Sequence, residues 1–446
     1  MLGFFRDRVA AMVTAVIIMS LASSCYTSRQ SAPDTKDLSY VYNPARNIFT
    51  PSVSLYNEDS ETTVLSVSLR RDELFFSEAN PEGVPKASIL LSVKLFDQTM
   101  GGNLADTANY KYDLLREEAG GGYAFRLPLK AYDGKSYTVA LKIIDLIRQR
   151  TVQVFIDFDR TGPYSSLNYK VRDHFTKNEI FSNILKPNQF INVLSPSLQP
   201  DTLWLFYYES VKELPAPPST VLPEVTLAPE PELIIPVPYA DTLPIMFPRE
   251  GIYMLSPDSL IREGLVLLNF GNDHPSFTSP ETMIPPLGYI ATREEMEALL
   301  SAEKPKLALD EFWLNRTGTI ERSKELIRIY YNRTLFANYY FSSYKQGWLT
   351  DRGMMYIIYG PPDKVYKNVE GESWGYKMPP VKSAWGSQYS STEEILWFNF
   401  SKKKNLFSQN DFVLNRAATP ISYWDIAVAR WREGKVFRLE TATEIQ

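Results

Sequence analysis

Charged side chains with catalytic potential concentrate in one short stretch of the chain. Asp351 and Arg352 follow a Gly-Trp-Leu-Thr run, and Asp363 lies twelve residues after Asp351, behind a Gly-Pro-Pro turn. Two carboxylates and a guanidinium could provide a general acid, a general base and an anion-binding group for hydrolysis or transfer on glycans or peptides. The residues of this stretch that could form a site are Gly347, Trp348, Thr350, Asp351, Arg352, Gly353, Gly360, Pro362 and Asp363.

A structural role also explains these residues. Gly347 could close a preceding helix with a positive φ, and Arg352 could pair with Asp351 or Asp363. Residues 354–359 are apolar on both faces, which predicts a covered central strand. Such a strand would hold the two carboxylates about 20 Å apart. We therefore favour a structural corner over a catalytic cluster.

The stretch from Gly347 to Gly353, with the Gly-Pro-Pro-Asp turn after it, resembles the signature of the GWxTD domain family. The resemblance spans roughly residues 290–420 and includes Phe312, Trp313, Tyr331, Arg333, Ala337, Asn338, Phe341, Trp374 and Tyr376. It implies a Bacteroidetes-type envelope lipoprotein with β domains ahead of the signature domain. It implies no particular catalytic activity.

The N-terminus has the features of a lipoprotein signal peptide. Arg6 and Arg8 precede an apolar run, and small residues lead to Cys25, the only cysteine in 446 residues. We expect cleavage after residue 24 and lipidation of Cys25, which gives the chain a membrane partner. The mature chain would then lack any disulfide. The resemblance to Bacteroidetes lipoproteins implies an acidic run after the cysteine in chains exported to the cell surface. Residues 26–29 lack such a run, so we expect the outer membrane and its periplasmic face.

Composition narrows the possible partners further. Loss of Arg6, Asp7 and Arg8 with the signal peptide changes the formal net charge from −5 to −6. A slightly acidic protein is a poor nucleic-acid ligand, so we expect no nucleic-acid partner. His174 and His274 are too far apart to form a recognisable metal motif, and we expect neither a metal nor a cofactor.

The hydropathy pattern predicts a multidomain chain. Residues 25–45 form the lipidated N-terminus and a spacer. Period-two alternation over 46–162 predicts an antiparallel β-sandwich. Residues 163–285 form a second β-rich domain with a Pro-rich segment, 213–248. This segment could be a linker between domains, but strand-like segments on both sides of it favour a projecting loop. Residues 286–446 form an α+β domain of the GWxTD type.

Local signals within this last region are stronger. Thr292 and Glu295 form a capping box that predicts a helix over 293–302. Further helices are expected at 307–315 and at 320–344. Besides 354–359, strands are expected at 374–376, 395–400 and 411–414, with the last one pairing back onto 395–400.

Other candidate sites rest on weaker patterns. Asp310 and Glu311 could suggest a glycosidase acid, although an exposed helix-face pair is the commoner meaning. Tyrosines and tryptophans around the signature could stack on sugars or could form the domain core. The resemblance to Bacteroidetes proteins also implies O-glycosylation at Asp-Ser/Thr-apolar triplets, which include Thr107, Thr202, Thr242 and Ser259.

These observations favour a non-catalytic envelope lipoprotein that acts as a structural or interaction module through its GWxTD domain. Its partner would be an envelope protein or a glycan. One alternative is a hydrolase or transferase that acts on envelope glycans or peptides through Asp351, Arg352 and Asp363. Another is a carbohydrate-binding module that uses exposed aromatic residues.

Overall fold

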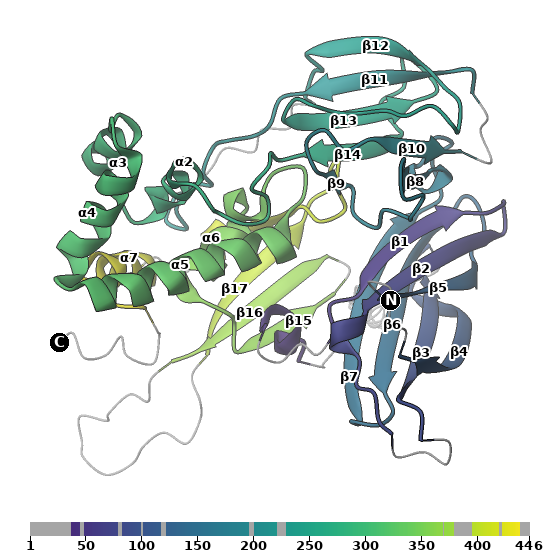
Figure 1. Cartoon of the computed structure of the whole chain (residues 1–446), viewed down its shortest axis with the longest axis horizontal. Coiled ribbons are helices and arrows are strands. Elements are labelled where there is room, and N and C mark those ends of the chain that lie inside the picture. Colours follow the sequence, from purple (N-terminus) through teal and green to yellow (C-terminus); the bar gives the residue numbers. More distant parts are fainter. Residues whose placement is uncertain are drawn as a thin grey trace, which may run out of the picture. The chain divides into compact units, whose positions relative to one another are not determined.

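The computed structural model describes residues 37–44, 49–78, 83–99, 101–116, 122–195, 200–220, 229–368, 370–378, 395–418 and 422–437. The predicted signal peptide and Cys25 lie outside these ranges. Within them the chain is rich in antiparallel sheets and contains six α-helices, α2 to α7, as expected of a multidomain protein (Figure 1). No helix in this part of the chain is long and apolar enough to cross a bilayer.

Two antiparallel sheets form the first region. One has the order β1-β2-β5, from strands Ser52–Asn57, Thr62–Arg70 and Gly122–Lys130. The other has the order β4-β3-β6-β7, from strands Asn103–Leu115, Lys86–Asp97, Ser136–Asp145 and Arg150–Asp159. Alternate side chains of both sheets meet in one hydrophobic core, which includes Leu65, Val67, Leu91, Val93 and Leu141. The period-two pattern of the sequence produces this arrangement.

A five-stranded sheet dominates the second region. Its order is β12-β11-β13-β14-β9, from strands Leu233–Pro238, Thr202–Tyr208, Gly251–Ser256, Leu265–Asn269 and Ile184–Leu185. A separate pair joins β8 (Lys170–Asp173) to β10 (Ile191–Leu194). Both faces of β13 are buried: Tyr253 and Leu255 belong to one core, whereas Ile252 and Met254 pack with Phe407 from the C-terminal region.

The predicted Pro-rich loop is partly wrong, because residues 233–238 form the edge strand β12. Pro236 and Pro238 are tolerated there, since an edge strand has one side without ladder hydrogen bonds. Residues 214–217 also do not project. They line a pocket against the C-terminal region.

Helices and an antiparallel sheet build the C-terminal region. The helices are α2 (Pro280–Met283), α3 (Arg293–Leu300), α4 (Pro305–Thr317), α5 (Ile320–Phe341), α6 (Asp351–Tyr359) and α7 (Ser422–Arg432). The sheet has the order β15-β16-β17-β18, from Lys364–Lys367, Gly371–Lys377, Ile395–Lys402 and Phe412–Leu414. Figure 1 shows β15, β16 and β17 of this sheet. The capping box of Thr292 and Glu295 is present, and β18 pairs back onto β17 as predicted.

The strand predicted at 354–359 is wrong, because these residues belong to helix α6. Thr350 caps this helix by accepting a hydrogen bond from the Gly353 N–H at 3.0 Å. All nine residues of α6 are buried, so no polar face distinguished a covered helix from a covered strand.

The prediction of a spacer over residues 25–45 is also wrong for residues 37–44. Residues 37–44, here called the anchor segment, include a 3₁₀ turn at Ser39–Tyr42 and pack into the C-terminal region. The Leu38 N–H donates to Val365 O at 2.8 Å, and the Tyr356 hydroxyl donates to Tyr42 O at 2.9 Å. Apolar Leu38 and Tyr42 provide the burial that a polar spacer would lack.

Candidate functional site

The signature corner (residues 347–353) depends on two close backbone approaches. A Cβ added to Gly347 would lie 2.0 Å from Ala337 O in α5, and one added to Gly353 would lie 1.9 Å from Gly347 O. Gly347 therefore serves contact with α5, and the expectation of a positive φ there is wrong. Gly360, at the end of α6, is the glycine that needs a positive φ, +88°.

Side chains of the corner satisfy its backbone groups. The Thr350 hydroxyl donates to Gly347 O at 2.7 Å while it caps α6. The Trp348 N–H donates to Asn338 Oδ1 on α5 at 3.1 Å, and the Trp348 side chain is buried. The corner thus fixes the start of α6 against α5.

Asp351 is held by a buried arginine. Its Oδ1 accepts from Arg416 Nη2 at 2.6 Å, and its Oδ2 accepts from Arg416 Nη1 at 3.0 Å and from the Leu414 N–H at 2.8 Å. The two side chains are 8% and 7% exposed. Both carboxylate oxygens are therefore engaged in a bidentate pair. Arg416 Nη2 also donates to Ala216 O at 2.8 Å, which links the signature to a distant segment.

Arg352 points to a different partner. Its Nη1 donates to Glu372 Oε1 at 3.1 Å, and its Nη2 donates to Asn410 Oδ1 at 2.5 Å. Its guanidinium lies 3.9 Å from the centroid of the Phe412 ring. The expected pairing of Arg352 with Asp351 or Asp363 is therefore wrong.

Glu372 is fully buried and accepts hydrogen bonds from several donors. It accepts from the Tyr42 hydroxyl at 2.9 Å and from Trp374 Nε1 at 3.1 Å, and Lys367 lies 3.5 Å away. Burial alone would raise the pKa of this carboxyl, but the charges of Arg352 and Lys367 hold its pKa below the usual range. Glu372 thereby joins the anchor segment to the signature corner.

Asp363 lies at the other end of α6. Its carboxylate is exposed and accepts from the Lys377 N–H at 2.9 Å. Pro362 beside it is buried. The nine residues of α6 span about 13 Å, so the two carboxylates are closer along the element than a strand would place them. Even so, each charged signature residue faces its own partner, and the three do not converge.

Two residues of the wider resemblance close the C-terminal end of α6. Arg333 Nη1 donates to Ile357 O at 2.9 Å and to Ile358 O at 3.0 Å. The Tyr376 hydroxyl donates to Gly360 O at 2.9 Å. These bonds satisfy carbonyl groups that a helix end leaves without partners.

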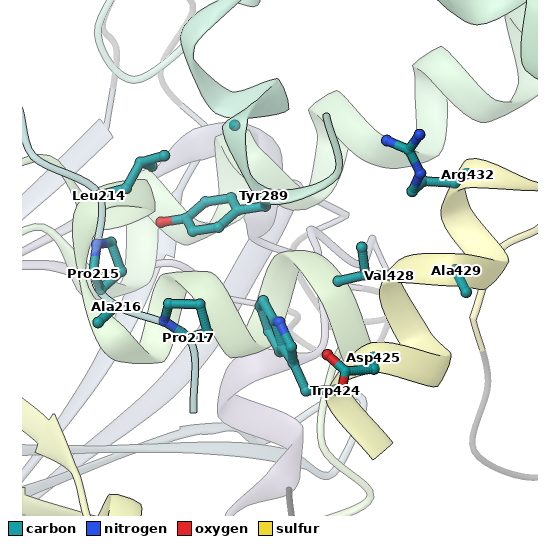
Figure 2. A pocket seen from close by; sticks show the side chains of 11 residues that line it. Leu214, Pro215, Ala216, Pro217, Tyr289, Trp424, Asp425, Val428, Ala429 and Arg432 are labelled. Carbon is teal, nitrogen blue, oxygen red and sulfur yellow. The ribbon is translucent and has the colours of Figure 1, made fainter. Parts of the chain in front are cut away.

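A pocket of about 470 Å³ opens beside the corner (Figure 2). One wall is the strap, defined as residues 214–217, and the other is α7, which contributes Trp424 and Val428. Tyr289 also lines it, and the Tyr289 hydroxyl donates to Trp348 O at 2.5 Å. Leu214 of the strap packs directly on backbone, because a Cβ at Gly288 would lie 2.5 Å from Leu214 Cδ1.

Two charged side chains of opposite sign, Asp425 and Arg432, line the α7 wall of this pocket. Asp425 is exposed and forms no ion pair with any residue that the structure describes. Arg432 pairs with Glu295 at 2.7 Å, but Glu295 is shared with Arg316, which lies 2.6 Å away. One carboxylate thus faces two guanidinium groups, which leaves this cluster with a net positive charge, and Arg432 Nη1 also donates to Ile290 O at 2.9 Å. The sequence did not indicate this pocket, because its walls come from segments about 200 residues apart.

The remaining predicted candidates do not join a site. Across the described ranges, no group of three potential metal ligands is present. His274 bonds Ser342 Oγ at 3.2 Å, and burial lowers its pKa to about 4. His174 bonds Asn192 instead. Asp310 forms an exposed helical pair with Lys306.

Aromatic residues around the signature mostly form the core. Five of those that could have stacked on sugars are buried, namely Tyr330, Tyr331, Trp348, Tyr356 and Tyr359. Tyr339, in contrast, is 51% exposed. Among the predicted glycosylation positions, Thr107 and Thr242 are exposed, whereas Thr202 and Ser259 are half-buried.

A helical corner braced by an antiparallel sheet thus defines the C-terminal region as a structural unit. Residues 251–433 match the family model for the GWxTD domain, and the chain therefore carries a domain of this family. The match starts at β13, before the predicted boundary at 286, and reaches the end of α7. Burial of one face of β13 and β14 with Phe407 agrees with the earlier start.

Similarity to other proteins is limited. No curated protein matches the chain. The beta-glucuronidase of Bacteroides uniformis is 16% identical over 26% of this chain and 14% of its own, with a TM-score of 0.18. A putative beta-galactosidase from Bacteroides fragilis is 14% identical over 24% of this chain and 16% of its own, with a TM-score of 0.17. Similarity at this level supports no conclusion about activity.

Proposed function

We propose that this chain is a lipid-anchored protein of the cell envelope that acts as a structural or interaction module through its GWxTD domain, without catalysing a reaction. The observation that carries the proposal is the burial of Asp351 and Arg352, whose charges are engaged by Arg416 and Glu372. A general acid or base must reach the proton that it transfers. Both oxygens of Asp351 are instead occupied within the chain.

The same bonds suggest what the signature does. Asp351 orients Arg416, and Arg416 holds the strap at Ala216. Arg352 and Glu372 hold Tyr42 of the anchor segment. Two adjacent signature residues thus fix two segments that lie outside residues 251–433. A motif with this role positions a surface, which is what an interaction module requires.

The remaining parts of the proposal concern placement in the envelope. Cys25 would carry the lipid on the periplasmic face of the outer membrane. The first region would act as a β-sandwich scaffold, and the C-terminal region as an α+β interaction domain. Between Cys25 and Asp37 the chain spans at most about 40 Å. The anchor segment would therefore keep the GWxTD domain within that distance of the membrane.

Recovery of a partner from the native envelope tests the interaction role. The full chain is crosslinked in cells, extracted in detergent and purified, with a Cys25→Ser chain as the control for anchoring. We expect a stoichiometric envelope protein or glycan with the wild-type chain, and loss of the membrane fraction with Cys25→Ser. Repeated recovery of the free chain would contradict the proposal.

A second measurement separates this role from catalysis. The purified chain is incubated with isolated envelope glycans and peptides, and products are followed by mass spectrometry. We expect no products. Products that disappear in a folded Asp351→Asn variant would instead establish the hydrolase or transferase.

A further inference from the structure

We infer that the pocket between the strap and α7 binds an extended, proline-containing segment of a partner protein that carries one basic and one acidic side chain. The inference deepens the proposed interaction role and rests on it. Its support comes from the pocket walls, from the spacing of the two pocket charges and from the bond between the strap and the signature.

The walls offer the surfaces that polyproline segments bind. Tyr289 and Trp424 provide aromatic surface, and Pro215 and Pro217 face the pocket from the strap (Figure 2). Aromatic-lined grooves bind proline-rich segments because such segments are already extended and lose little entropy on binding. The pocket volume of about 470 Å³ falls within the usual range for binding sites.

The charges set the chemistry of the partner. Asp425 and Arg432 lie seven residues apart on α7, which corresponds to about 10 Å along the helix. Two side chains separated by two intervening prolines lie about 9 Å apart in polyproline conformation. A segment of the type Arg-Pro-Pro-Glu therefore places its arginine at Asp425 and its glutamate at Arg432. Trp424, next to Asp425, adds an aromatic surface for the arginine.

The signature stabilises the wall of this pocket that the strap forms. Arg416 Nη2 donates to Ala216 O at 2.8 Å, and Asp351 holds both terminal nitrogens of Arg416. Asp351 is thus a positioning residue for one pocket wall. Loss of the Asp351 carboxylate should weaken the binding of every ligand to a similar extent, because it changes the pocket wall and leaves both pocket charges in place.

The test uses the full chain in detergent and short fluorescein-labelled peptides, with binding followed by anisotropy. One peptide contains Arg-Pro-Pro-Glu, and a second contains Gln-Pro-Pro-Glu. We expect the arginine peptide to bind about tenfold more tightly to the wild-type chain. Asp425→Asn should remove this preference, because the carboxylate that selects the arginine is gone.

Matched variants separate local effects from general ones. Asp310→Asn removes an exposed helical carboxylate outside the pocket and should keep the tenfold preference. Asp351→Asn should weaken the binding of both peptides, while the ratio of their affinities stays the same. Unchanged melting temperatures of the Asp425 and Asp310 variants serve as the folding control.

Two results would overturn the inference. One is equal binding of both peptides by the wild-type chain, and the other is an unchanged preference in Asp425→Asn. If the native partner is recovered equally by wild type and Asp425→Asn, the pocket assignment fails while the interaction role stands. If the wild-type chain recovers no partner and binds neither peptide, both fail.

Discussion

Removal of the Arg352 charge should convert Glu372 from a stabilising group into a destabilising one. In Arg352→Met the methionine keeps an apolar stem on Phe412, but Glu372 loses the guanidinium at 3.1 Å. An ion left uncompensated in a protein interior costs about 3–5 kcal/mol. Lys367 at 3.5 Å and the donors Tyr42 and Trp374 remain, so we expect a loss of about 3 kcal/mol at pH 7.

The stability difference between Arg352→Met and the wild type should decrease as the pH falls. In the wild type the pKa of Glu372 lies below its ordinary value of 4.5, so its contribution to stability is present above that pH and is lost as the pH falls through the lower pKa. In Arg352→Met, burial should prevail and raise the pKa above 4.5. The penalty should then shrink as the pH falls from 7 towards 5, and the stability gap to the wild type should narrow.

Urea unfolding followed by tryptophan emission measures both effects at pH 7, 6 and 5. A double variant, Arg352→Met with Glu372→Gln, serves as the matched control, because it leaves no buried carboxylate and should recover about 2 kcal/mol at pH 7. A gap that stays constant between pH 7 and pH 5 would refute the reasoning. So would a double variant that is no more stable than Arg352→Met.

Three further predictions concern the corner and its surroundings. Thr350→Ala should cost about 1–2 kcal/mol, because it removes the cap of α6, and Thr350→Ser should recover most of this loss in thermal unfolding. Gly353→Ala should cost about 3 kcal/mol, because the new methyl would lie 1.9 Å from Gly347 O; an unchanged melting temperature would contradict the packing described. Burial lowers the pKa of His274 to about 4. The free energy of unfolding should therefore decrease as the pH falls below 6.5, the pKa of histidine in the unfolded chain. His274→Asn should therefore show a smaller loss of stability between pH 7 and pH 5, and a ring NMR signal of His274 that titrates near pH 6.5 would exclude this explanation.

Helix boundaries near the signature were predictable because they depend on neighbouring residues. The capping box of Thr292 and Glu295 starts α3 at Arg293, as the sequence indicated. Thr319 caps α5, where the third helix was expected. Side-chain acceptors compete for the first N–H groups of a helix within three residues, so the signal lies in the local sequence.

The nature of α6 was not predictable from the same kind of signal. Met354 to Tyr359 carries no polar face, because α5, the sheet and the signature turn cover the helix on all sides. Periodicity distinguishes a helix from a strand only when one face contacts water. A threonine before an apolar run suits a turn into a strand as well as a helix cap, so Thr350 did not distinguish the two.

The partners of the signature charges lie beyond any local pattern. Tyr42 and Glu372 are 330 residues apart, and Arg416 lies 65 residues after Asp351 and 200 after Ala216. Only the folded chain brings them together, so the sequence offered Asp351 and Asp363 as the nearest partners of Arg352. This limitation follows from the dependence of burial on contacts between distant segments.

Because the signature charges are buried, the signature has a structural role in this domain, and we expect partner binding to take place at another surface. Ions are costly to bury, so a chain that buries Asp351 and Arg352 must supply Arg416 and Glu372 in matching positions. Those partners also bind the strap and the anchor segment. Chemistry at the signature itself would require breaking these pairs, whereas binding at the pocket wall that they hold requires no such change. The pocket between the strap and α7, lined by the exposed carboxylate of Asp425 and by Arg432, whose partner Glu295 is shared with Arg316, is therefore the surface where charge can meet a partner.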